Sequence, residues 1–147
     1  MIERANRALI KASTAALQAD AGLAAAFAGK PVQVLEIVPE MGPSRPVKYP
    51  LVTFGGAEKQ RLPDSCGKAR ALVSLFVQVW DADQTITRLS DIAEACEAPL
   101  LKLALAPETG LAINARRHVV TRCQYDRDSA LLYGLCQIEF QVNALAG

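Results

Sequence analysis

The segment from Leu135 to Val142 alternates between apolar and polar side chains, and this pattern constrains the fold more than any other feature of the chain. Its apolar members are Cys136, Ile138, Phe140 and Val142, and its polar members are Gln137, Glu139 and Gln141. A two-residue period of this kind predicts a strand with one buried face. A sheet with an apolar face needs a covering layer, so we expect helices against it.

Four further segments have the composition of strands, namely residues 32–38, 49–54, 71–80 and 111–125. The last of these should form a hairpin with the final strand, because a short polar connection separates them. Five prolines or glycines punctuate residues 39–50, and Gly55 and Gly56 should end the second strand. We therefore expect two long polar loops, at residues 39–50 and 55–70.

Two amphipathic helices are expected. Apolar residues recur every three or four positions from Ile2 to Ala16, and again from Ile86 to Leu103. Pro99 should kink the second helix or restart it with Pro99 in a first turn. The candidate caps before it are Asp81, Asp83 and Thr85. The prediction is a single α+β domain over residues 1–147, with a mostly antiparallel sheet of about five strands flanked by two main helices, in the order α-β-β-β-α-β-β.

Bulk composition excludes several classes of protein. The chain has 51% hydrophobic and 21% charged residues with a net charge of +1, which indicates neither disorder nor a large positive field for nucleic acid. No apolar run approaches the roughly 20 residues that span a bilayer. The opening residues lack the pattern of a secretory signal. The four cysteines form no Cys-x-x-Cys pair and three lie on apolar faces, which favours reduced thiols in a protein made in the cytoplasm.

The sequence offers little catalytic chemistry. His118 is the only histidine, and the arginines around it suggest an exposed basic strand face. Asp81 and Asp83 are better explained as helix caps than as cation ligands, and no phosphate-binding loop follows any of the glycines. We therefore expect no catalytic residue, no metal and no cofactor, and we predict that the protein is not an enzyme.

The strand at residues 71–80 has a second face that is only partly polar, because it carries Phe76 and Trp80. Such a face is expected to be covered. The first helix of the same subunit or a neighbouring subunit could cover it, and the sequence leaves both alternatives open.

Four blocks of the chain, residues 2–5, 49–55, 77–81 and 134–142, together resemble the tail terminator, or tail-completion, proteins of long-tailed phages, prophages and gene transfer agents. The resemblance implies a subunit of a ring, expected to be a hexamer, at the head-proximal end of the tail tube in the virion. Such a ring would stop tube growth, join tail to head and let DNA pass without specific binding. Its partners would be the tail tube protein and a head-closure or neck protein, with no membrane involved. The candidate residues for contacts with neighbouring subunits or the tube are Tyr49, Lys59, Arg61, Phe76 and Trp80.

Three alternatives remain open. A head-closure or other neck protein has a related size and sheet. A small ligand-binding domain or enzyme would need a deep pocket near His118 or Asp81. A nucleic-acid-binding module could use the loop bases Lys59, Arg61, Lys68 and Arg70, although acidic residues lie among them.

Overall fold

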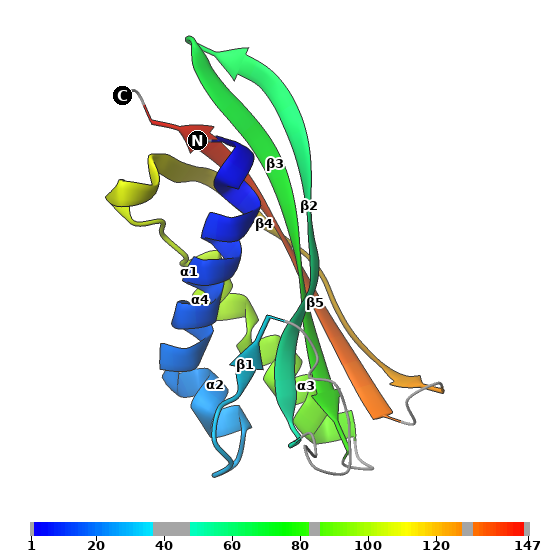
Figure 1. The fold of residues 1–147 in the computed structure, drawn as a ribbon. Coiled ribbons are helices and arrows are strands. Elements are labelled where there is room, and N and C mark those ends of the chain that lie inside the picture. The colour runs from blue at the N-terminus through cyan, green and yellow to red at the C-terminus, as the bar shows by residue number, and fades with distance from the viewer. Residues whose placement is uncertain (1, 37–47, 83–85, 128–130, 146–147) are drawn as a thin grey trace, which may run out of the picture.

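The computed structural model describes residues 2–36, 48–82, 86–127 and 131–145. Within them, five strands form one sheet in the order β1-β2-β3-β5-β4. The strands are β1 (Val34–Leu35), β2 (Leu51–Ser65), β3 (Lys68–Asp81), β4 (Leu111–Asp126) and β5 (Leu131–Ala144). The helices are η1 (Ile2–Arg4), α1 (Ala5–Ala19), α2 (Ala21–Ala26), α3 (Ile86–Ala95), α4 (Glu97–Leu101) and η2 (Pro107–Thr109). The α helices lie on one side of the sheet, so the fold has two layers (Figure 1).

The sheet is antiparallel except for the β1–β2 pair, which is parallel. This confirms the α+β class and the predicted order of helices and strands. The first strand is shorter than expected, because β1 ends at Leu35, and residues 37–47, with most of the first expected loop, lie outside the described residues.

The prediction of a second long loop, at residues 55–70, is wrong. β2 continues through Gly55 and Gly56 by a β-bulge and pairs with β3 as far as Ser65 and Lys68. Cys66 and Gly67 make the turn, with positive φ angles of 52° and 74°. Two successive left-handed residues match the twist of a two-residue hairpin turn, in which the second position favours glycine.

The core lies between the helices and one face of β3 and β5. Every second residue of β3 from Ala71 to Val79 has 0% exposure, and so do Cys136, Ile138, Phe140 and Val142 of β5. These side chains form one cluster with apolar residues of α1, α2, α3 and α4. The alternation predicted for both strands is confirmed, since their apolar faces meet the helices.

The two helical regions follow their predicted stripes except at Ile86, which was expected to face the core and is 51% exposed. In α1, Leu9 and Leu17 are fully buried, and Asp20 caps α2 by accepting a hydrogen bond from the Leu23 amide at 2.9 Å. The second amphipathic region is two helices, because α3 ends at Ala95 and α4 begins at Glu97. Pro99 is the third residue of α4, so the restart alternative is confirmed and the proline interrupts no established helix.

Gly134 of β5 sets how closely α3 approaches the sheet. A Cβ atom at this position would contact Ala93 Cβ at 3.4 Å and Leu89 Cδ1 at 3.5 Å. Since these are ordinary van der Waals distances, α3 packs almost directly on the β5 backbone.

Candidate assembly surface

Among the described residues, no helix covers the face of the sheet that points away from α1 and α3, and we call it the open face (Figure 1). Side chains of residues paired across antiparallel strands share a face, so the open face can be assigned from the register. On β3 it carries Leu72, Ser74, Phe76, Gln78 and Trp80, and on β5 it carries Tyr133, Leu135, Gln137, Glu139 and Gln141. All but Leu135 are half-buried, and they mix apolar with amide side chains.

Phe76 and Trp80 therefore lie opposite α1. The alternative in which the first helix covers both aromatic side chains is wrong, because α1 packs on the other face of β3 (Figure 1). Strand alternation alone could not decide this, since it assigns two faces without saying which one the helices occupy.

Trp80 belongs to a cluster that joins three strands. Its ring lies 4.9 Å from the ring of Tyr133, centroid to centroid, with 49° between the planes. The indole Nε1 donates to Thr53 Oγ1 at 3.2 Å, and Gln78 Nε2 donates to the Tyr133 hydroxyl at 3.2 Å. These contacts hold the side chains of the cluster in fixed positions relative to one another. Trp80 was predicted for the surface, whereas Thr53, Gln78 and Tyr133 were missed, because only the strand register brings them together.

Gly55 gives this cluster its space. A Cβ atom at Gly55 would stand 2.4 Å from Gln78 Nε2 and 2.5 Å from Gln78 Cδ, far inside contact distance. The bulge between Phe54 and Gly56 places Gly55 against this side chain. Any other residue would displace Gln78 and its bond to Tyr133.

The β2–β3 hairpin forms an arm, defined as residues 58–70, that extends past the end of α1 (Figure 1). Both faces of its β2 strand are exposed at Glu58, Lys59, Gln60 and Arg61. Because no layer covers either face there, the arm needs no apolar alternation. This is why its sequence reads as a polar loop.

The base of the arm is fastened to the amino-terminal turn. Lys59 Nζ donates to the carbonyls of Ile2 and Glu3 at 3.3 and 3.2 Å, and Asn6 Nδ2 donates to the Ala57 carbonyl at 3.3 Å. Further out, Arg61 pairs with Asp64 at 3.4 Å, with both side chains more than half exposed. Of the two predicted arm residues, Lys59 bonds to its own chain and Arg61 lies on the exposed arm.

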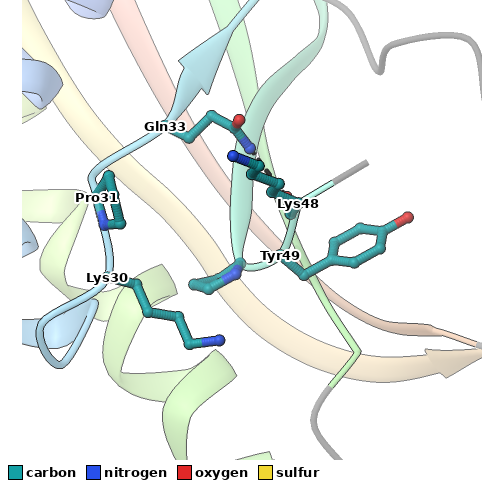
Figure 2. Close-up of a pocket in the computed structure, with 6 residues that line it drawn as sticks. Lys30, Pro31, Gln33, Lys48 and Tyr49 are labelled. Atoms are coloured by element: carbon teal, nitrogen blue, oxygen red, sulfur yellow. Dashed lines mark hydrogen bonds between the residues drawn. The ribbon is translucent and has the colours of Figure 1, made fainter. Parts of the chain in front are cut away.

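Tyr49 lies beside a shallow hollow of about 360 Å³ at the start of β2 (Figure 2). The hollow is lined by Lys30, Pro31, Gln33, Lys48, Tyr49 and Pro50. Gln33 Nε2 donates to the Lys48 carbonyl at 2.9 Å, which fixes one wall. The Tyr49 ring points away from the other labelled side chains, and partial burial raises the pKa of its hydroxyl. His118 and Asp81 are absent from this lining.

The five predicted contact residues do not gather at one place. Lys59 and Arg61 lie on the arm, Phe76 lies in the middle of the open face, and Trp80 lies near the start of β2, where Leu51 is its partner. Tyr49 lies at the hollow. The structure therefore divides the five residues among the arm, the open face and the hollow at the start of β2.

His118 is not an exposed histidine on a basic face, and this prediction is wrong. A bulge between His118 and Val120 turns both His118 and Thr121 toward the helices, since their partners are Ile138 and Cys136. The imidazole Nε2 lies 2.7 Å from Thr121 Oγ1 and 3.2 Å from Glu97 Oε1. The inserted residue, Val119, reverses the alternation that the sequence suggested.

Asp81, predicted as a helix cap, forms an ion pair with Arg88 of α3. Its carboxylate is fully buried at the end of β3 and accepts two hydrogen bonds from Arg88 of α3, at 2.7 and 2.6 Å. The other two predicted caps, Asp83 and Thr85, lie outside the described residues. The bidentate pair ties the end of β3 to α3.

The cysteines are free thiols. Burial raises the pKa of Cys96 and Cys123, and it raises the pKa of Cys136 to about 11, so all three stay protonated near neutral pH. Cys66 is exposed in the arm turn. Among the described residues, no cluster of three or more histidine, cysteine or acidic side chains could hold a metal ion.

The protein is an α+β fold in which helices cover one side of the sheet, with an exposed arm and an aromatic cluster on its open face. Within the described residues, no helix is long and apolar enough to cross a membrane. Comparison of the sequence with protein-family models and with curated proteins gives no match.

The fold itself is shared with a solved structure. One chain in the virion of a native gene transfer agent particle matches with a TM-score of 0.74 and 18% sequence identity. The match covers 94% of this chain and 96% of that chain. At this identity the likeness shows a common fold, which extends from end to end in both proteins.

Proposed function

We propose that this protein is a virion structural protein that caps the head-proximal end of a phage or gene transfer agent tail tube as a ring subunit. The observation that carries the proposal is the end-to-end likeness to a chain of a gene transfer agent virion, with 94% and 96% of the two chains covered. The resemblance of residues 2–5, 49–55, 77–81 and 134–142 to tail terminator proteins supports the particular role. In this role the ring, a hexamer, stops tube polymerisation and offers a surface to a head-closure or neck protein.

The exposed features suit a closed ring. A ring needs a heterologous interface, in which one patch of each subunit meets a different patch of the next. The open face and the arm are two such patches on different parts of the subunit. We assign Phe76, Trp80 and Tyr49 to contacts at the open face and the start of β2, and Arg61 to contacts of the arm. Lys59 contributes by holding the base of the arm.

Electron microscopy with tail tubes from the same particle tests the role. The expected result is a cap at one tube end and a native mass six times that of one chain. A protein that stays monomeric and leaves tube ends bare would overturn the proposal. Density at the head portal instead of the tube would transfer the protein to a neck role.

A matched pair of variants tests the surface. Phe76→Glu places a charge on the open face, whereas Ile86→Glu places one on an exposed apolar residue of α3 at 51% exposure. We expect Phe76→Glu to abolish rings while the monomer stays folded, and Ile86→Glu to leave rings intact. Equal effects of the two variants would remove the open face from the interface.

A further inference from the structure

The two edges of the sheet differ in how far their backbone hydrogen-bonding groups are paired. β4 is a 16-residue strand, and within the part of the chain that the structure describes it pairs on one side only, with β5. Among the described residues, no backbone group outside β5 hydrogen-bonds to the backbone of residues 112–126. After the bulge at Val119, seven successive residues from Val120 to Asp126 keep a regular register with β5. This stretch presents an unbroken row of main-chain donors and acceptors.

The opposite edge, on β2, is closed in several ways. β1 pairs with β2 at Val52 and Thr53, and the side chain of Asn6 donates a hydrogen bond to the Ala57 carbonyl. Lys59 fastens η1 beside the same strand. Pro63, further along, lacks an amide hydrogen. These are the devices that keep an edge from pairing with another chain, and residues 120–125 of β4 have none of them.

The charge along β4 selects the kind of strand that could pair with it. β4 includes three arginines, and its one acidic residue is the last, Asp126, in a chain of net charge +1. Arg122 is exposed and has no ion-pair partner in the described part of the chain, while Arg117 pairs with Glu139 at 3.1 Å and remains 68% exposed. A second copy of β4 would place arginines near arginines, which is unfavourable.

We propose that the outer edge of β4 from Val120 to Tyr125 binds an extended, acidic segment of a partner protein by strand addition. Main-chain hydrogen bonds to β4 supply the general affinity, as in other cases of β-augmentation. A carboxylate of the added strand lies beside Arg122 on the open face, forming a charge-assisted hydrogen bond. On the other face, Tyr125 is 58% exposed and offers its ring to an apolar side chain of the same segment. This proposal does not depend on the tail-capping role.

Two synthetic seven-residue peptides serve as probes. In one, glutamate alternates with threonine, and in the other, lysine replaces glutamate. Fluorescence anisotropy with the full chain should show at least about tenfold tighter binding of the acidic peptide. Arg122→Glu should abolish that preference, whereas Lys30→Glu, an exposed charge reversal away from β4, should preserve it.

Amide hydrogen exchange distinguishes strand addition from simple charge attraction. The acidic peptide should slow exchange in residues 120–125 and leave the arm at residues 58–70 unchanged. Binding without slower exchange in β4 would overturn the proposal, and so would equal binding of the two peptides. A single-stranded DNA oligonucleotide that binds with the same Arg122 dependence and excludes the peptide would assign this edge to nucleic acid instead. Thermal unfolding of both variants confirms that each is folded.

Discussion

The two faces of β3 differ in burial. On the covered face, alternate residues from Ala71 to Val79 are completely buried under the helices. On the open face, Phe76 and Trp80 are only half-buried, although both side chains are larger than any of those five. The difference teaches that burial on the covered face supplies stability, whereas the open face keeps partly exposed apolar area that stays available for the contacts proposed above.

The largest expected loss of stability comes from comparing a phenylalanine on the covered face with one on the open face. Phe140→Ala on the covered face should lower the free energy of unfolding by about 3–5 kcal/mol, because it leaves a cavity in a closed core. Phe76→Ala on the open face should cost less than half as much, since the side chain already meets solvent. Urea unfolding followed by circular dichroism measures both. Equal losses would show that the open face is as much a part of the core as the covered one.

Two glycines, one beside each face of the sheet, sharpen the comparison. Gly55→Ala on the open face should cost about 1–2 kcal/mol, because its Cβ overlaps Gln78. Gly134→Ala on the covered face should cost less, since its nearest contacts are at 3.4–3.5 Å. A double-mutant cycle checks the cause, because the Gly55→Ala penalty should largely vanish in a Gln78→Ala background. An unchanged penalty would place its origin in the backbone.

Features that follow from short-range sequence patterns were predicted correctly. Alternation found β3 and β5, and the three-to-four spacing found α1 and the α3–α4 pair, because each element buries one face against another. Pro99 marked the break between α3 and α4 for a local steric reason. These features depend on short-range patterns that a single sequence displays.

The features that sequence reasoning missed are set by register or by the absence of burial. The arm lacks alternation because both of its faces meet solvent, so residues 58–67 look like a loop. The bulge at Val119 places His118 on the helix side of the sheet. No local sequence pattern indicates where a single residue is inserted into a strand. The cluster of Trp80 with Tyr133 depends on how β3 and β5 align, and it therefore joins residues 53 positions apart only in the folded chain.

The arm provides a smaller test. Lys59→Met should remove two hydrogen bonds to η1 and lower the stability of the molecule by about 0.5–1 kcal/mol. Arg61→Met should change stability by no more than about 0.5 kcal/mol, because its ion pair with Asp64 is exposed. Amide exchange in residues 2–10 should accelerate in the first variant alone. Faster exchange in both would mean that the whole arm, rather than its base, steadies the amino-terminal turn.

The smallest effect tests the covered face through pH. Burial raises the pKa of Cys136 from 9.0 to about 11, so the folded protein keeps this proton to a higher pH than the unfolded chain does. The resulting stabilisation is therefore complete below about pH 9 and is lost as the pH rises toward about 11. At pH 9.5 the loss from this group should be less than about 1 kcal/mol. Comparing urea unfolding of the native chain and Cys136→Ala at pH 8 and pH 9.5 isolates it, because Cys96, whose pKa is raised by burial and by the Cys136 charge, keeps its proton in the folded state at both values. The native chain should lose more stability than the variant, whereas parallel losses would mean that water reaches the β5 face beneath the helices.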